Sequence, residues 1–354
     1  MKEAMLYQKL DGDKVLCQLC AHYCVITNGK KGICQVRENR EGTLYTLVYG
    51  RTITQNVDPI EKKPLYHFYP GSQAFSIGTP GCNMHCDWCQ NWEISQMPRE
   101  QHFIAGYELS PADIVSAAKK SACRSIAYTY TEPTIFFEYS YDTAKLAREA
   151  EIANIYVSNG YMSAEMLELF HPWLDAVNID LKTFRDETYR QYTGGKLQPV
   201  LDSLKKIHDY GIWLEVTTLV IPGVNDDPQE LQEIAEFIAT ELGTDTPWHV
   251  SRFYPQYKLQ QTPPTPPDTL HRAGEIGRAA GLNYVYLGNL AEETDTCCPA
   301  CGKVLIRRSG FGVNSNQVGS NGCCPDCGET IAGVGMAVGA GFPRPDAEEQ
   351  REGS

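Results

Sequence analysis

A tight group of cysteines constrains this chain more than any other feature. It lies in the run Gly81-Cys82-Asn83-Met84-His85-Cys86-Asp87-Trp88-Cys89, with the spacing C-x3-C-x2-C. Three thiolates in one loop can bind three irons of a cubane [4Fe–4S] cluster, which leaves the fourth iron open to a small molecule. The spacing therefore predicts a reactive cluster. The alternatives are three buried thiols or an incomplete zinc site.

The central region, residues 71–292, alternates apolar runs with amphipathic segments of helical period. This alternation predicts the α/β class with a parallel sheet, and six or seven units fit a partial (β/α)6 barrel. The predicted strands are Gln73–Gly78, Ser125–Thr129, Ile155–Ser158, Ala176–Leu181, Trp213–Ile221, Trp248–Phe253 and Tyr284–Leu287. The predicted helices are Pro111–Ala122, Thr134–Glu151, Ala164–Phe170, Val200–Tyr210, Pro228–Thr240 and Asp268–Ala280. The cysteine run follows the first strand, at the end where barrels place their chemistry.

The cysteines also divide the chain. Of the 14 present, all but Cys123 fall into three clusters, and Cys123 is expected to be a packed thiol. Residues 1–70 form a cysteine-rich segment, 71–292 the barrel and 293–336 a second cysteine-rich module. Residues 337–354 lack a core-forming pattern, and we expect a disordered tail there.

Composition narrows the class of protein. The net charge of −13 argues against a nucleic-acid binder that neutralises phosphates. No apolar run approaches the roughly 20 residues of a membrane span, and the N-terminal residues lack an apolar signal core. Cysteines in a chain without an export signal favour metal ligands over disulfides. We therefore expect a cytoplasmic enzyme.

The N-terminal cysteines have the spacing C-x2-C-x3-C-x9-C and are Cys17, Cys20, Cys24 and Cys34. Four thiolates suit either a structural Zn²⁺ or a second iron–sulfur cluster, and His22 could replace one of them. The segment is too short and polar to bury four free thiols. It therefore predicts a closed metal site, with zinc slightly favoured over a cluster.

The C-terminal cysteines form two C-P-x-C-G motifs, Cys298-Pro299-Ala300-Cys301-Gly302 and Cys324-Pro325-Asp326-Cys327-Gly328. The glycine after each second cysteine lets the chain turn so that backbone N–H groups face the sulfurs. The pair predicts a zinc-ribbon-like or rubredoxin-like module that Zn²⁺ holds together. A redox iron is the alternative, and Cys297 and Cys323 are expected to be spare thiols.

Polar and charged residues stand where three of the predicted strands end. Glu132 precedes Pro133, which suits the first turn of a helix. Asp180 and Lys182 share one face of a strand and are flanked by apolar residues. The full set of candidate pocket residues is Glu132, Ser158, Asn159, Asp180 and Lys182. Two other interpretations remain: Glu132 could complement the helix dipole, and the Asp–Lys pair could be a solvated edge.

The cysteine run, with Trp88 before its last cysteine, resembles the signature of the radical S-adenosylmethionine (SAM) superfamily. The resemblance implies that SAM binds the open iron and that one electron cleaves it to methionine and a 5′-deoxyadenosyl radical. It implies that the segment ending in Glu132-Pro133 binds the SAM ammonium group, although Tyr130 and Thr131 replace the two glycines of the family. It also implies that the Ser158-Asn159 turn lies beside the methionine end of SAM.

Further motifs narrow the resemblance. The runs Asp180-Leu181-Lys182, Tyr192-Thr193-Gly194-Gly195 and Ile221-Pro222-Gly223-Val224-Asn225-Asp226 resemble those of glycyl-radical activating enzymes, in which the Asp-x-Lys pair contacts SAM. The whole chain resembles the radical SAM enzymes of the AmmeMemoRadiSam system, which are similar to pyruvate formate-lyase activating enzymes. The motifs that carry this second resemblance are Cys17-x2-Cys20-x-His22, Gly32-Ile33-Cys34-Gln35-Val36-Arg37, the run from Asp58 to His67, Gln90-Asn91-Trp92, Arg252-Phe253-Tyr254-Pro255 and Tyr286-Leu287-Gly288-Asn289.

The resemblance implies an oxidoreductase-like radical enzyme that abstracts hydrogen from a substrate it does not identify. It implies a reductant such as flavodoxin or ferredoxin, a protein substrate, and Memo-type or AMMECR-type proteins as partners. Two other functions stay open: an iron–sulfur electron-transfer module and an RNA-modifying radical SAM enzyme. A plain electron carrier needs no charged pocket, and the acidic balance weighs against RNA.

Overall fold

A sheet of eight strands forms the centre of the computed structural model, which describes residues 1–339. Its order is β16-β15-β14-β13-β12-β11-β9-β8, and all strands run parallel except β8, which is antiparallel to β9. The strands are β8 Thr54–Pro59, β9 Gln73–Gly78, β11 Ser125–Tyr128, β12 Ala153–Ser158, β13 Ala176–Asp180, β14 Trp213–Val220, β15 Trp248–Arg252 and β16 Val285–Gly288. This sheet confirms the predicted α/β class and partial barrel.

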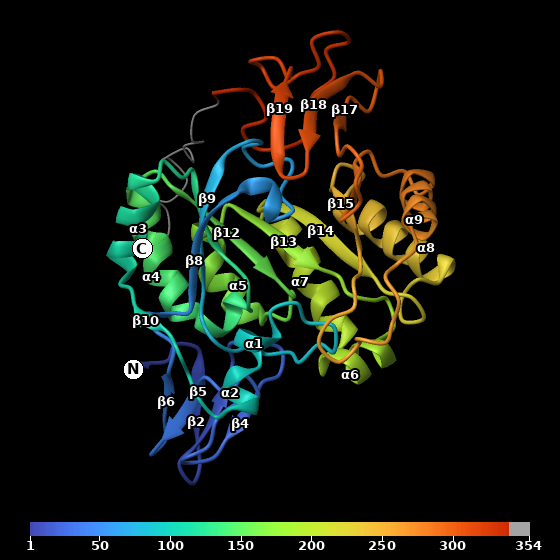
Figure 1. Cartoon of the computed structure of the whole chain (residues 1–354). Helices are drawn as coiled ribbons and strands as arrows, with labels where there is room; N and C mark the ends of the chain where they lie inside the picture. The colour runs from blue at the N-terminus through green and yellow to red at the C-terminus, as the bar shows by residue number, and fades with distance from the viewer. Residues whose placement is uncertain (340–354) are drawn as a thin grey trace.

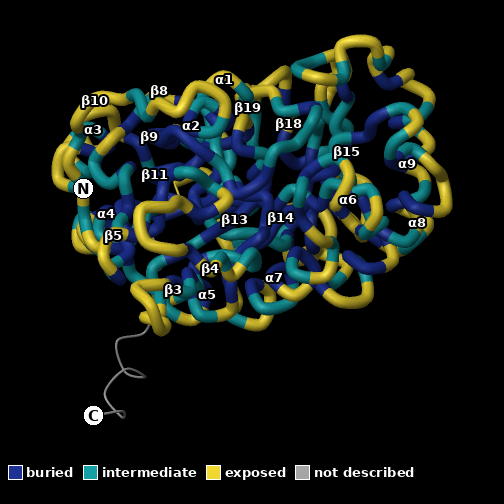
Figure 2. The backbone as a smooth tube through the Cα atoms, turned by 90° about the horizontal axis from the view of Figure 1, so that it is seen from below, coloured by how far each residue is buried: buried dark blue, intermediate teal, exposed yellow. Residues whose placement is uncertain are grey.

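Helices connect the parallel strands and lie on the outer side of the sheet (Figure 1). They are α3 Pro111–Lys120, α4 Phe137–Glu149, α5 Ala164–Phe170, α7 Leu197–Asp209, α8 Pro228–Phe237 and α9 Pro267–Ala279. The predicted helices correspond to these, with small shifts at the ends. Three more helices were not predicted: α1 Trp92–Ser95, α2 Met97–Glu100 and α6 Asp186–Thr193. Figure 2 shows the strands buried at the centre and the connecting turns exposed.

The N-terminal residues form small antiparallel sheets at one end of the molecule (Figure 1). One sheet holds β1 Lys2–Glu3, β5 Arg37–Arg40 and β6 Thr43–Thr46, and a second holds β2 Tyr7–Leu10, β3 Lys14–Cys17 and β4 Val25–Ile26. Strand β7 Arg51–Thr52 pairs with β10 Tyr107–Glu108, which comes after the cysteine loop. Strand β8 joins the central sheet although it precedes residue 71. The division of the chain at residue 70 stays a prediction.

The C-terminal module is a sheet of β17 Thr296–Cys297, β18 Val304–Ser309 and β19 Gly312–Asn316. Arg308 of β18 is buried and anchors the module. Its Nη2 donates to the Tyr66 carbonyl at 2.9 Å, and its Nε lies 3.6 Å from Glu61 Oε1. A buried guanidinium needs such partners to offset its lost hydration. Residues 340–354 of the predicted tail lie outside the described residues.

His67 forms a second link between the barrel and the C-terminal module. The ring is buried, with Nδ1 2.6 Å from the Ala332 carbonyl and Nε2 2.6 Å from the Tyr286 hydroxyl. The carbonyl can only accept, so Nδ1 carries a proton and Nε2 can accept from the hydroxyl. Burial lowers the pKa of His67 to about 4. The neutral ring therefore fits this contact.

Across residues 1–339, no helix has the length and apolar character that crossing a membrane requires.

This link predicts a pH dependence of unfolding. Between about pH 6.5 and pH 4 the unfolded chain protonates His67 and the folded chain does not, so stability falls as the pH falls. The loss attributable to His67 is about 3 kcal/mol over that window. We expect His67→Gln to flatten the pH profile of the thermal midpoint. Parallel profiles for the two proteins would contradict the buried neutral ring.

Candidate active site

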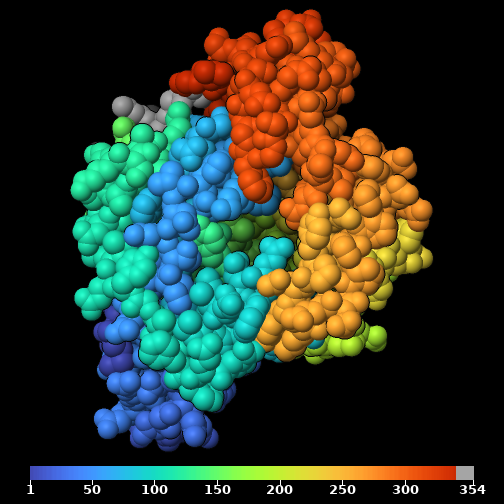
Figure 3. All heavy atoms as spheres, in the orientation of Figure 1, coloured from blue at the N-terminus to red at the C-terminus, as the bar shows by residue number. Residues whose placement is uncertain are grey.

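A cavity of about 700 Å³ opens at the carboxyl ends of the parallel strands. Figure 3 shows the hollow on this face, with the C-terminal module overhanging it. The cavity is lined by every residue predicted for the barrel site, namely Cys82, Cys86, Cys89, Glu132, Ser158, Asn159, Asp180 and Lys182. Residues from four strand ends thus meet in one place, as the barrel geometry requires.

Backbone carbonyls at the end of α6 bind the cysteine loop on one side. His85 N donates to the Thr193 carbonyl at 2.9 Å, and Asp87 N donates to the Tyr192 carbonyl at 3.0 Å. The next residue, Gly194, has φ +75°, and a Cβ there would lie 2.3 Å from His85 Nε2. The Tyr-Thr-Gly-Gly run therefore supports the loop through its backbone and leaves room for it.

The loop is held from the opposite side by Asn159. Asn159 Nδ2 donates to Asn83 Oδ1 at 2.8 Å and lies 3.8 Å from Cys82 Sγ.

Burial raises the pKa of the Cys82 thiol, and the carboxylate of Glu132 raises it further. Burial likewise raises the pKa of Cys86 to about 12, although Lys182 opposes the shift. Such thiols need a bound cation to ionise, which an iron–sulfur cluster supplies.

Glu132 is buried at the end of β11, just before a 3₁₀ turn. Its Oε1 accepts from Thr134 N at 3.0 Å and from Ser158 Oγ at 2.7 Å, and its Oε2 accepts from Asn159 N at 2.9 Å. These donors are all neutral. Burial raises the pKa of the carboxyl, while the hydrogen bonds lower it. The carboxyl is therefore fixed in place at the cavity wall, where a cationic ligand would favour its ionised form.

Asp180 and Lys182 face each other at the end of β13. Lys182 Nζ donates to Asp180 Oδ2 at 2.8 Å, and Asp180 remains 40% exposed at its side chain. Although burial opposes it, Asp180 raises the pKa of Lys182. Asn225, which the sequence did not mark as a site residue, donates to the Lys182 carbonyl at 2.6 Å and so fixes the backbone of the pair.

Tyr130 stands where the resemblance implies a glycine, and its surroundings show how the chain accommodates it. Its φ is +68°, a left-handed conformation that glycine adopts without strain. Its hydroxyl donates to Asp58 and also accepts from Asn56 Nδ2 at 3.0 Å, while Lys63 Nζ lies 4.6 Å from its ring centre. The side chain thus ties the end of β11 to β8, an interaction that offsets the backbone strain.

A second polar pair at the cavity was also missed. His249 of β15 lines the cavity, and its Nε2 lies 2.6 Å from Glu215 Oε2. Although burial opposes it, His249 lowers the pKa of the Glu215 carboxyl. Each residue stands alone among apolar residues of its strand and forms no recognisable motif. The two side chains nevertheless lie on the same face of neighbouring parallel strands, and this placement could have predicted the pair.

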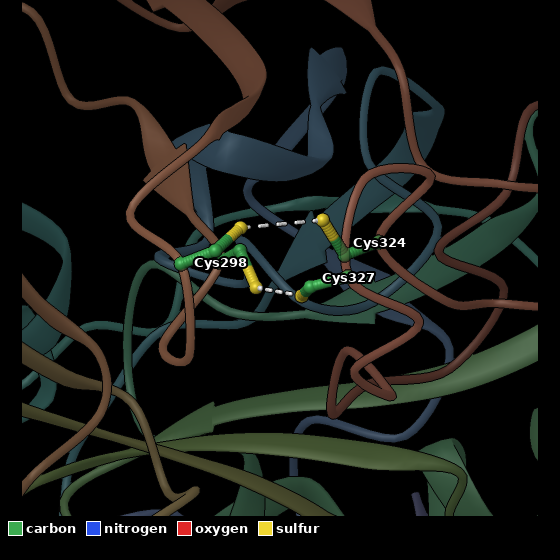
Figure 4. Close-up of side chains that lie close together, drawn as sticks. Cys298, Cys324 and Cys327 are labelled. Carbon is green, nitrogen blue, oxygen red and sulfur yellow. Dashed lines mark hydrogen bonds between the residues drawn. The ribbon is translucent and has the colours of Figure 1, made fainter.

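The C-terminal cysteines meet as predicted. Cys298 Sγ lies 3.5 Å from Cys327 Sγ, and Cys301 Sγ lies 3.7 Å from Cys324 Sγ (Figure 4). All four sulfurs lie within 4.8 Å of one another. Tetrahedral zinc with bonds of about 2.3 Å spaces its thiolates about 3.8 Å apart, which fits these distances. Gly302 and Gly328 both have positive φ, as the predicted turns require.

The other cysteines are more widely spaced. In the described part of the chain, the C-terminal set is the one group of three or more ligand atoms gathered as closely as a single ion requires. Cys17, Cys20, Cys24 and Cys34 do not meet this spacing, and neither do Cys82, Cys86 and Cys89. A cubane cluster separates its thiolates more than one ion does, because each binds a different iron. The site residues and the metal at the N-terminal set stay predictions.

Comparison with known proteins identifies the family. The model of the radical SAM superfamily matches residues 76–238. The chain is 46% identical over 310 residues to an uncharacterised protein of Methanocaldococcus jannaschii, covering 87% of this chain and 92% of that protein. It is 23% identical over 164 residues to the pyruvate formate-lyase-activating enzyme of Clostridium pasteurianum, covering 45% of this chain and 66% of that enzyme. The chain belongs to the radical SAM superfamily.

A solved structure, Streptococcus suis SuiB bound to S-adenosylmethionine, matches with 13% identity and a TM-score of 0.49, covering 65% of this chain and 53% of that one. Family membership confirms the resemblance drawn from the cysteine loop. The narrower resemblance to the AmmeMemoRadiSam system stays a prediction.

The support under the cysteine loop can be tested at Gly194. Gly194→Ala adds about 1 kcal/mol of backbone strain and a clash with His85. Gly211→Ala is a matched control, because Gly211 has φ +69° and a Cβ added there would meet no atom within 4 Å. We expect both variants to lose thermal stability, Gly194→Ala more than Gly211→Ala, and a markedly lower iron content after anaerobic reconstitution only for Gly194→Ala. Equal iron contents would show that the loop does not depend on this contact.

Proposed function

We propose that the protein reductively cleaves S-adenosylmethionine and uses the resulting radical to abstract hydrogen from a substrate. The observation that supports this most is the convergence of the three loop cysteines and the five polar pocket residues on one cavity. When bound, a [4Fe–4S] cluster supplies the electron for cleavage of SAM to methionine and a 5′-deoxyadenosyl radical. Cys82, Cys86 and Cys89 would hold three of its irons.

The charges of the pocket match the zwitterionic end of SAM. Glu132 would accept hydrogen bonds from the ammonium group, and Lys182 would donate to the carboxylate. Asp180 holds Lys182 in place and is exposed enough to contact the ligand itself. Ser158 and Asn159 act through Glu132, because both donate to its carboxylate.

The kind of substrate, the protein partners and the metal of the C-terminal module are further parts of this proposal. Similarity to activating enzymes supports a protein substrate, with a flavodoxin or ferredoxin as reductant. We propose that the C-terminal module holds Zn²⁺ as a structural ion, because its four sulfurs have the spacing of tetrahedral zinc. An electron-transfer module without SAM chemistry is less well supported, since it needs no zwitterion-binding pocket.

The proposed reaction is tested by anaerobic reconstitution with iron, sulfide, reductant and SAM. We expect 5′-deoxyadenosine and an EPR signal of the reduced cluster that changes when SAM is added. Replacing Cys82, Cys86 and Cys89 together by Ala should abolish both. A SAM-sensitive signal that survives in this triple variant would refute the assignment.

The pocket is tested by SAM affinity in cluster-loaded protein. Losing one charge-assisted hydrogen bond costs about 1.5–3 kcal/mol, or roughly tenfold to a hundredfold in affinity. We expect Glu132→Gln and Asp180→Asn to weaken SAM binding by this amount with iron content unchanged. Glu233→Gln is the control, because Glu233 pairs with Arg185 outside the cavity. If both pocket variants bind SAM as tightly as the control does, these strand ends are not the SAM site.

A further inference from the structure

We propose that Cys17, Cys20, Cys24 and Cys34 hold a second iron–sulfur cluster that receives electrons from an acidic protein donor and passes them to the Cys82 loop. This rests on the proposed function for the final electron acceptor. Sequence alone slightly favours zinc at this site. The structure adds four observations that favour a cluster with a relay role.

The first observation is the spacing of the thiols. The C-terminal set of the same chain gathers as zinc requires, while the N-terminal set does not. The N-terminal cysteines nevertheless belong to one small fold: Cys17 N donates to the Cys24 carbonyl at 2.9 Å, and Tyr23 N, next to Cys24, donates to the Cys20 carbonyl at 3.1 Å. Four neighbouring thiols spaced too widely for one ion fit the separate irons of a cubane.

The second observation is contact with the barrel cluster loop. His22 Nε2 lies 2.7 Å from the carbonyl of Asn83, the residue after Cys82. A Cβ on Gly81, the residue before Cys82, would lie 3.3 Å from the Cys34 carbonyl. The N-terminal segment therefore packs against both neighbours of Cys82. An electron leaving the N-terminal site has a short, packed route to the barrel loop.

The third observation is a buried cation three residues after Cys34. Arg37 is 1% exposed, its Nη1 donates to Glu138 Oε1 at 2.9 Å, and its Nη2 donates to the Met5 carbonyl at 2.6 Å. Its Nε is buried and has no hydrogen-bond partner among the described residues. A buried N–H without a partner is costly and uncommon. A cluster sulfur would supply the missing acceptor, and the guanidinium would stabilise the negative charge of the reduced cluster.

The fourth observation is the surface of this segment. Residues 14–37 contain no Asp or Glu, although the chain carries a net charge of −13. Lys14, Lys30 and Lys31 are exposed there. Tyr23, Val25 and Ile33 are also exposed, at 39%, 60% and 42%. A segment that exposes apolar and cationic side chains and contains no acid suits an acidic partner, which opposite charge would steer to the site. We therefore assign the occupant as an acidic one-electron carrier with a flavin or an iron–sulfur centre.

The proposed transfer from the carrier to SAM is balanced in electrons. The carrier loses one electron and is oxidised, and the N-terminal cluster gains that electron and is reduced. The N-terminal cluster returns to its oxidised state when it passes the electron to the cluster at Cys82. That electron is the one consumed in breaking the sulfur–carbon bond of SAM.

Metal content and EPR test the cluster. The variants are Cys82/Cys86/Cys89→Ala, Cys20/Cys34→Ser, and the control Cys123→Ser, whose thiol stands apart from the clusters. After anaerobic reconstitution, we expect wild type and control to hold about twice the iron of either cluster variant. The Cys82/Cys86/Cys89 variant should keep a reducible EPR signal that SAM does not change. If that variant is iron-free and holds one zinc beyond that of the C-terminal module, the N-terminal site is a zinc site and the proposal fails. A SAM-sensitive signal in wild type would then still support the proposed function.

Electron delivery tests the relay in chains that keep both clusters. Reduction by a photoreduced acidic flavodoxin is compared with reduction by dithionite, which is small enough to reach the open cavity directly. We expect Lys30/Lys31→Glu to lower the ratio of the two rates severalfold, and added salt to lower the ratio in wild type. Lys205→Glu is the control, because Lys205 pairs with Glu241 on the barrel. A ratio unaffected by both the charge reversal and salt would overturn the docking assignment.

Discussion

The structure depends on how a short loop with no regular secondary structure is held still. The cysteine loop is fixed by hydrogen bonds from three parts of the chain: the end of α6, the turn after β12 and the N-terminal segment. The contacts are those of Thr193, Asn159 and His22 with the backbone or side chains of residues 83–85. Contacts that fix the separations of the three thiolates before a metal binds reduce the ordering cost of binding, so these hydrogen bonds favour a cluster at the loop.

Burial has two opposing consequences at this site. It raises the pKa of the Cys82 and Cys86 thiols and of Glu132, which disfavours the charged forms that a cluster and a zwitterionic ligand need. It also removes water, which strengthens each remaining charge–charge interaction. By itself the pocket therefore disfavours the ionised forms of its own side chains. A ligand of opposite charge would favour those ionised forms. Asp180 and Lys182 avoid part of this cost because they pair with each other.

The sequence predicts the parts of this protein that follow local rules. Apolar runs located the parallel strands, and the predicted pocket residues follow from the rule that strand ends meet at the barrel mouth. Helix α6 was not predicted because its sequence is polar, with Tyr189 and Thr193 as its buried residues. The roles of Asn225 and Tyr130 could not be predicted, because each depends on a partner distant in sequence. The C-terminal sulfurs meet as their motifs predict, whereas the wider spacing of the N-terminal ones became visible only in three dimensions.

The C-terminal module shapes the route by which a substrate reaches the cavity. Gly310 and Phe311, at the turn between β18 and β19, line the cavity, and Phe311 is 48% exposed. The strand before this turn carries Arg308, whose buried guanidinium contacts Tyr66, and Tyr66 also lines the cavity. The position of the turn is thus tied to the cavity wall by a buried charge. An ion held by the four cysteines would order the module and thereby also part of the cavity mouth.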